Sequence, residues 1–264
     1  MKKIIIQFLI LAIAFFGLWF ALSQFHFTGY FKVKSLSRST EEKLGNVMID
    51  YLNKTEQQVD SDSVLTILKR IEGRICRYNN IDSSAIKLYV FRNKEVNAFA
   101  LPGKKLILYS GIIGDSQNPE ELSSVVAHEI AHMKHRHVIK KLTKEFGISM
   151  LMVLASSDAG TQIVKELLKV ISSTSFDREM EREADSSATG YLIRAHIDPR
   201  HFSDFLFRIS REKTGIPENF EWINTHPDTK ERIAAIIKLR RNHVIQSLPV
   251  LSDADWHCLK RNAK

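Results

Sequence analysis

The sequence predicts an α+β protein that is mostly helical, with a small β-sheet directly before its motif-bearing helix and with an N-terminal transmembrane helix. Three observations lead to this fold class. Residues 4–22 form an apolar run, three short segments between residues 86 and 109 have the alternation of strands, and most other apolar residues recur at helical spacing. A chain of 264 residues can bury one substantial core. We expect an anchor, a helical accessory region, a main domain and a tail without clear signal, over residues 1–24, 25–80, 81–245 and 246–264.

The N-terminal apolar run has nearly the length of a membrane span. It extends from Ile4 to Leu22, close to the roughly 20 residues that cross a bilayer. Lys2-Lys3 precede it, so the positive-inside rule places the N-terminus in the cytoplasm and the rest of the chain on the outer, periplasmic side. Residues 21–23 also have the form of a signal cleavage site, and removal of the run stays an alternative.

Capping residues and apolar spacing predict the elements that follow. Ser39-Thr40-Glu41-Glu42 has the form of a capping box and starts a helix, and a second apolar stripe predicts a helix over 64–75. Alternation predicts strands over 86–91, 97–101 and 106–109.

Helices dominate the rest of the chain. Asn118-Pro119 opens the motif-bearing helix, because proline suits the first helical position. The apolar segments 147–154 and 163–171 are too short to span a bilayer, so we expect them to pack near the site or to touch the membrane surface. Pro227 begins a helix that ends at Arg240.

The most informative motif is His128-Glu129-Ile130-Ala131-His132. Residues at i and i+4 lie one above the other on a helix, so the two imidazoles can bind one Zn²⁺ together. Glu129 follows the first ligand, where it can take a proton from a zinc-bound water. The spacing therefore predicts a catalytic zinc site with one Zn²⁺ per chain.

A third protein ligand is needed, and two candidates follow along the chain. His135 returns to the same helix face but lies about 10 Å from His128 along the axis, and no glycine follows to break the helix. Glu181 is the better candidate, because it shares an otherwise apolar helix face with Asp185, and buried acids need a partner. Asp185, one turn later, can hold a ligand histidine through its other ring nitrogen. His135 and His137 are expected to be solvated or to support the ligands.

Together these two motifs resemble the gluzincins, and within them the HtpX/BepA-type, Oma-type and CAAX-prenyl-protease-type zinc peptidases. Three further segments over about residues 75–240 resemble the same family. They are Asn97 to Gly103, Leu106 to Gly111, and Thr225-His226-Pro227 followed by Glu231-Arg232-Ile233. The chain departs from the family at Lys104-Lys105, where members usually carry a less charged pair, and this affects the expected substrate preference rather than catalysis.

The resemblance implies a zincin-like domain over residues 81–245 and a membrane-anchored zinc endopeptidase. Carried over residue by residue, it implies His128, His132 and Glu181 as ligands, Glu129 as the catalytic base and Asp185 as a supporting residue. His226 is expected near the metal, either donating to the developing oxyanion or occupying the open position as a gate. The implied substrates are unfolded or membrane-associated proteins, in quality control of the cell envelope.

The sequence disfavours other functions, which serve as the alternatives that experiments must distinguish. The formal net charge of +8 has no accompanying nucleic-acid module, so we expect no nucleic acid and favour an anionic membrane surface as the counterpart. A membrane-tethered chaperone or assembly factor with a structural or vestigial zinc remains the main alternative, although a structural site needs no base such as Glu129. Cys76 and Cys258 are compatible with one disulfide or with two free thiols.

Overall fold

The computed structural model describes residues 36–156, 160–212, 221–227 and 229–263. The predicted transmembrane segment and the predicted 1–24 anchor lie outside these residues. Within the described part of the chain, no helix is both long and apolar enough to cross a bilayer.

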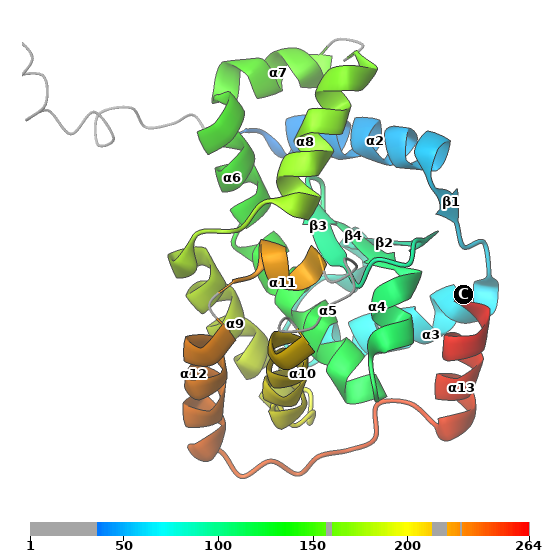
Figure 1. Cartoon of the computed structure of the whole chain (residues 1–264), viewed down its shortest axis with the longest axis vertical. Helices are drawn as coiled ribbons and strands as arrows, with labels where there is room; N and C mark the ends of the chain where they lie inside the picture. Colours follow the sequence, from blue (N-terminus) through cyan, green and yellow to red (C-terminus); the bar gives the residue numbers. More distant parts are fainter. Residues whose placement is uncertain (1–35, 157–159, 213–220, 228, 264) are drawn as a thin grey trace, which may run out of the picture. The chain divides into compact units, whose positions relative to one another are not determined.

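The described residues are mostly helical and contain one small sheet, as predicted (Figure 1). The strands are β1 (Gln57–Gln58), β2 (Lys87–Arg92), β3 (Ala98–Leu101) and β4 (Lys105–Tyr109). The helices before the motif are α2 (Arg38–Thr55), α3 (Asp62–Arg77), the 3₁₀ turn η2 (Ser83–Ala85) and α4 (Ser110–Asp115). The motif helix and those after it are α5 (Pro119–Lys134), α6 (His137–Phe146), α7 (Ile148–Ser156), α8 (Thr161–Ser173), α9 (Arg178–Arg194), α10 (Arg200–Glu212), α11 (Glu221–Thr225), α12 (Thr229–Arg241) and α13 (Asp253–Asn262).

The sheet is mixed and has the strand order β1-β2-β4-β3. β2 and β4 run parallel, whereas β3 pairs antiparallel with β4, with Phe99 opposite Ile107. The hairpin turn between β3 and β4 requires a glycine, because Gly103 has a φ of 73° and its Cβ would lie 2.9 Å from Cα of Glu42. β3 is the edge strand of this order, and it packs against α5.

Alternate strand residues enter two separate cores, because side chains of a strand point to opposite faces. In β4, Leu106 and Leu108 join the core formed with α3 and α5, whereas Ile107 and Tyr109 join the core formed with α2, α6 and α8. Figure 1 shows the sheet between α2 and α8 on one side and α3 and α5 on the other. Both faces are covered, which explains why all residues of β3 and β4 are buried.

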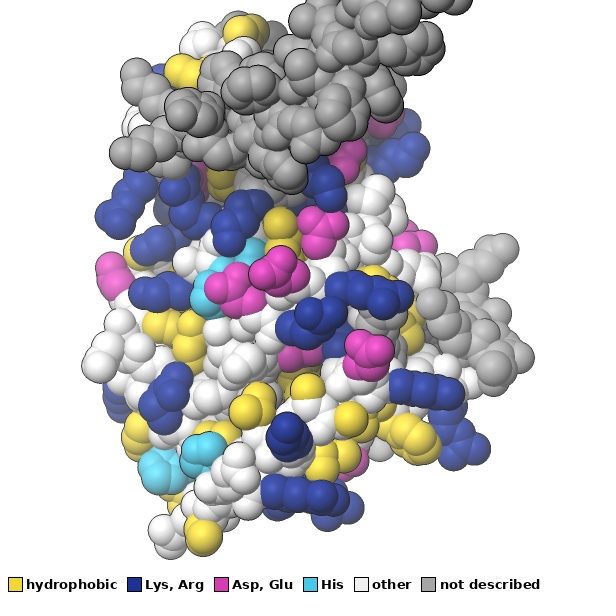
Figure 2. Space-filling model, turned by 90° about the vertical axis from the view of Figure 1, so that its left-hand side faces the viewer, with side chains coloured by type: hydrophobic (Ala, Val, Ile, Leu, Met, Phe, Trp, Pro, Cys, Tyr) yellow, Lys and Arg dark blue, Asp and Glu magenta, His cyan; other side chains and the backbone are white. Residues whose placement is uncertain are grey.

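The helices after the motif pack around α5. α9 and α10 both contact α5, and α12 packs across α9 and α10. Because α5 is covered by the sheet on one side and by these helices on another, its motif residues are buried rather than exposed. Figure 2 shows the outer side of α6, α9 and α12, where Lys and Arg side chains lie interspersed with Asp and Glu.

Several helix boundaries differ from the predicted ones. α2 begins earlier than the Ser39 box, because the side chain of Ser37 accepts the hydrogen bond from the Thr40 amide and caps the helix. α12 begins at Thr229 rather than at Pro227. The tail contains α13, whose first turn is capped by Ser252 through the amide of Asp255.

The two cysteines are free thiols. Cys76 is buried on α3 and donates a weak hydrogen bond to Glu72, at 3.7 Å. Cys258 is partly buried on α13, which packs against α3. Of the two alternatives left by the sequence, the structure therefore contains free thiols rather than a disulfide.

Candidate metal centre

The motif helix is well defined at its start and buried along most of its length. The Asn118 side chain accepts a hydrogen bond from the Glu121 amide at 2.8 Å, and Pro119 occupies the first turn. His128 and His132 are fully buried, and Glu129 is 1% exposed. The helix therefore presents the two histidines and the glutamate inside the molecule, where polar side chains require partners.

Four buried side chains converge beside α5 and form what we call the metal-centre cluster: His128, His132, Glu181 and His226. α9 contributes Glu181, and His226 follows α11 directly. One ligand atom from each of the four lies within 4.8 Å of the others. The structure thus brings together the three ligands expected from the sequence and His226, which was expected near the metal.

The spacing of these atoms fits a tetrahedral cation. The Nε2 atoms of His128 and His132 are 2.9 Å apart, and Nδ1 of His226 lies 3.1 Å from Nε2 of His128. Oε1 of Glu181 lies 2.8 Å from Nδ1 of His226 and 3.3 Å from Nε2 of His132. Ligands about 2.0–2.1 Å from a tetrahedral zinc are separated by about 3.3 Å. Buried imidazole nitrogens this close need a proton or a cation between them, so the donor set fits a metal ion.

Asp185 and Arg232 support the cluster from behind. Oδ1 of Asp185 lies 3.0 Å from Nδ1 of His128, at the ring nitrogen that does not face the cluster. Arg232 donates to both carboxylate oxygens of Asp185, at 2.7 and 2.8 Å, and its Nη1 lies 3.0 Å from Oε2 of Glu181. Burial alone would raise the pKa of Glu181, but His226 and Arg232 hold it well below the usual range. Burial likewise raises the pKa of Asp185, but Arg232 and His128 lower it below its usual range, so both acids are held as carboxylates.

His132 has a corresponding partner in His137. Their Nδ1 atoms lie 3.0 Å apart, and Nε2 of the buried His137 lies 3.0 Å from Oε2 of Glu183. His135 contacts the other oxygen of Glu183 at 2.9 Å and Ser187 at 2.8 Å. His135 is thus directed to the exposed side of α9 and does not belong to the metal-centre cluster.

Glu129 faces the cluster without belonging to it. Trp222 donates from Nε1 to Oε1 of Glu129 at 3.1 Å, and the backbone of Ala100 in β3 also hydrogen-bonds this carboxylate. Oε2 of Glu129 is buried and has no hydrogen-bond partner among the described residues. Burial raises the pKa of Glu129 to about 7, against the opposing effects of His128 and Trp222.

His226 is held between aromatic rings. Its imidazole stacks on Trp222 and on Phe176, with ring centroids 4.5 and 5.4 Å away. Burial lowers the pKa of His226 to about 4, and Nε2 lies 3.5 Å from Oε1 of Glu129. The histidine is therefore neutral, with one nitrogen toward the ligands and the other toward Glu129.

Sequence reasoning missed Arg232 and Trp222, and it missed the pairing of His137 with Glu183. Arg232 belongs to a segment that resembles the family, but the pattern did not connect it with Asp185. Trp222 was not predicted. His137 was expected to be solvated or to support the ligands, and it contacts His132, but its pairing with Glu183 was not predicted. The sequence does contain a signal for His137, because it lies five residues after His132 in a histidine-rich turn. The contacts of Trp222 and Arg232 are long-range, so no local pattern indicates them.

Comparison with known proteins identifies the same family. A model of peptidase family M48 matches residues 66–240. The mitochondrial metalloendopeptidase OMA1 of Schizosaccharomyces pombe is 29% identical over 171 residues, which cover 64% of this chain and 51% of that protein. The beta-barrel assembly-enhancing protease of Escherichia coli K12 is 25% identical over 244 residues, which cover 86% of this chain and 48% of that protein. OMA1 of Saccharomyces cerevisiae is 31% identical over 147 residues, which cover 54% of this chain and 43% of that protein.

The chain spans about half the length of the curated relatives it matches. The resemblance predicted from the motifs is confirmed by the family model, which includes every residue of the metal-centre cluster. Since that model covers more than half of the sequence, the chain belongs to peptidase family M48.

Proposed function

We propose that this chain is a zinc endopeptidase that hydrolyses peptide bonds within protein substrates. The observation that carries the proposal is the convergence of His128, His132 and Glu181 on one point, with the carboxylate of Glu129 beside it and not within it. A structural metal site needs no such group. The nitrogen and carboxylate donors suit zinc, and three protein ligands are the usual number at a catalytic zinc site.

Zinc bound by these three residues supplies a Lewis acid that polarises a water molecule and the scissile carbonyl. The chain's own residues do the rest. Trp222 holds one oxygen of Glu129, which leaves Oε2 to take the proton of the attacking water and to pass it to the leaving amine. Asp185 and His137 fix the ring orientations of His128 and His132 through their second nitrogens. We expect His226 to hydrogen-bond the carbonyl oxygen as negative charge develops on it.

The substrate is proposed to lie extended along β3. β3 is at the edge of the sheet, and a peptide added to such an edge forms main-chain hydrogen bonds without a sequence requirement. Ala100 links this edge to the Glu129 carboxylate. A peptide paired with β3 therefore passes the group that activates water.

Glu129→Gln tests the proposal. The amide has nearly the same shape but cannot act as a base, and loss of general-base catalysis costs about 10²–10⁴ in rate. Unfolded casein is the substrate, and metal content is measured in parallel. We expect the variant to keep its metal and fold and to lose hydrolysis. Equal rates for the variant and the wild type would contradict the peptidase mechanism and favour the chaperone alternative.

Location is a separate part of the proposal. We infer that residues 4–22 anchor the protein, with the catalytic domain over 81–245 on the outer face of the membrane and with unfolded or membrane-associated proteins as substrates of envelope quality control. The apolar length and the two preceding lysines support the anchor. A reporter active only in the cytoplasm, fused after Lys264, is expected to be inactive. Its activity would contradict this topology, and a shortened soluble product would indicate cleavage.

A further inference from the structure

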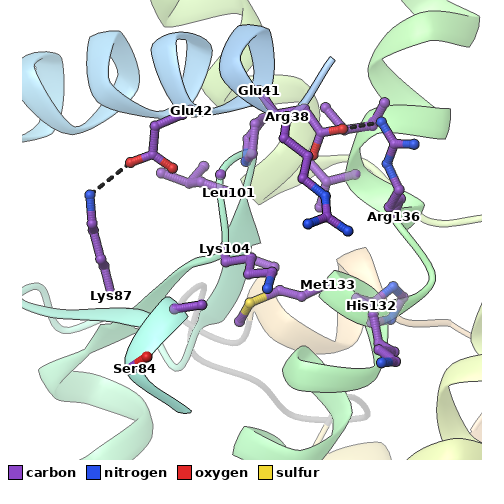
Figure 3. A pocket seen from close by; sticks show the side chains of 17 residues that line it. Arg38, Glu41, Glu42, Ser84, Lys87, Leu101, Lys104, His132, Met133 and Arg136 are labelled. Carbon is purple, nitrogen blue, oxygen red and sulfur yellow. Dashed lines mark hydrogen bonds and ion pairs between the residues drawn. The ribbon is translucent and has the colours of Figure 1, made fainter. Parts of the chain in front are cut away.

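A cavity of about 580 Å³ lies directly beside the metal-centre cluster, with His132 in its wall. α2, the β3–β4 turn and the junction of α5 with α6 enclose it (Figure 3). This volume is within the range of about 300–1,000 Å³ typical of ligand pockets. Among its lining residues, the proposed function uses only His132 and the end of β3, with Ala100 and Leu101.

The lining is strongly basic. Five Lys or Arg side chains and two acidic ones line the cavity besides His132. Both acids are already paired, Glu41 with Arg136 and Glu42 with Lys87 and Lys105. An excess of positive charge therefore remains in the wall.

Three cations in this wall form no ion pair within the described part of the chain: Arg38, Lys104 and Lys134. They come from α2, from the β3–β4 turn and from the last turn of α5, so three distant segments bring like charges together. Lys104 acts on Asp82 only as a longer-range charge. Figure 3 shows Arg38 and Lys104 extending into the cavity, with Met133 and His132 along its wall. Like charges around one cavity repel one another, and together they attract an anion.

The position of the cavity relative to the strand edge indicates which anion. Ala100, Leu101 and Pro102 of β3 and its turn line the cavity, and Ala100 also hydrogen-bonds the Glu129 carboxylate. A strand advances about 3.3 Å per residue. A peptide that runs along β3 past Glu129 therefore reaches the three cations within about three residues of the bond that is cleaved.

We propose that this cavity is a subsite for an acidic substrate side chain, aspartate or glutamate, at one fixed position within about three residues of the scissile bond. The inference rests on the proposed peptidase function and names the substrate feature that this site recognises. Arg38 and Lys104 are the specificity-determining residues, with Lys134 contributing to the same field. The methylene groups of a glutamate pack on Met133 while its carboxylate meets the cations.

The test uses matched peptides in which one position is Glu, Gln or Lys, scanned over three residues on each side of the scissile bond. Wild type is expected to prefer Glu over Gln at one position by about tenfold in kcat/KM, the combined effect of two or three partly exposed charge pairs. The preference should appear mainly in KM and weaken as salt rises. In R38E/K104E it should be lost or reversed. Thermal unfolding of each variant verifies that the fold is intact.

Lys43→Glu is the matched control. Lys43 is exposed on the same helix as Arg38 and does not line the cavity, so the substitution changes net charge without touching the subsite. K43E should retain the preference for Glu. Equal cleavage of Glu and Gln peptides by wild type, a preference that survives in R38E/K104E, or an equal loss in K43E would each overturn the inference.

Binding separates this inference from the peptidase proposal. Fluorescence anisotropy with the Glu129→Gln variant measures affinity for the same labelled peptides without cleavage. Tighter binding of the Glu peptide, lost when R38E/K104E is added, supports the subsite even if hydrolysis is absent in wild type. Equal binding of Glu and Gln peptides overturns the subsite even if wild type hydrolyses casein.

Discussion

Arg232 and Asp185 form a buried, bidentate ion pair next to His128 of the metal-centre cluster. Nε and Nη2 of the arginine donate to the two carboxylate oxygens at 2.7 and 2.8 Å, and both side chains are less than 5% exposed. Nη1 donates to the carbonyl oxygen of His226 at 2.7 Å. Arg232 on α12 thus fixes both Asp185 on α9 and the backbone of His226.

Replacing Arg232 should therefore affect stability as well as metal binding. Arg232→Met leaves Asp185 and Glu181 without their shared cation, and breaking a buried ion pair typically costs about 3–5 kcal/mol. We expect a loss of that size in the free energy of unfolding, measured by urea denaturation of the metal-free protein. Arg232→Lys keeps one charge but not the two parallel hydrogen bonds, so it should lie between Met and wild type. A Met variant as stable as wild type would show that the pair contributes nothing.

Glu181→Ala should strongly reduce the amount of bound metal. The substitution removes one of the three proposed protein ligands and leaves the two histidines on α5 unchanged. Metal content per chain after dialysis, measured by elemental analysis, gives the result. Glu179→Ala is the control, because Glu179 is exposed on the same helix. Full occupancy in Glu181→Ala would mean that another group completes the site, with His226 and then His135 as the first to replace.

Asp185→Asn should damage metal retention more than Glu129→Gln does, although it should damage hydrolysis less. Its amide no longer supplies the negative charge beside Nδ1 of His128, and loss of such a supporting contact commonly costs about 10–100-fold in metal affinity or activity. Glu129 lies outside the metal-centre cluster, so we expect its replacement to leave the metal bound. Competition with a chelator ranks metal affinity, and casein hydrolysis at saturating zinc ranks catalysis. The same order in both assays would contradict the separate roles.

Much of the site could be predicted from the sequence, because helical periodicity is local. The i, i+4 spacing puts His128 and His132 on one face, and the apolar positions around Glu181 and Asp185 turn those acids inward, as their burial in α9 shows. Strands β2, β3 and β4 were predictable for the same reason, since alternation and the turn at Pro102-Gly103 act over a few residues, whereas the two-residue β1 was not predicted.

The rest depends on tertiary contacts that no local pattern encodes. Trp222 reaches Glu129 across 93 positions of sequence, and Arg232 reaches Asp185 across 47. Glu183 is exposed on α9, yet it pairs with His135 and His137, which lie before and at the start of another helix, rather than with a neighbouring arginine. α10 was also not predicted, although its buried Phe202, Phe205, Leu206 and Ile209 have helical spacing.

The two cysteines should differ sharply in reactivity. Cys76 is fully buried, and burial, together with the nearby Glu72, raises the pKa of its thiol to about 12. The thiolate is the reactive form, so in the folded protein at pH 8 this thiol is both protonated and inaccessible. Cys258 is only partly buried. A thiol reagent added to the folded protein without reductant should therefore label Cys258 alone, and denaturant should make both thiols react. In Cys258→Ser, rapid labelling should disappear and one thiol should react after unfolding. If no thiol reacts in denaturant, the two cysteines form a disulfide, and if both react rapidly in the folded protein, α3 does not bury Cys76.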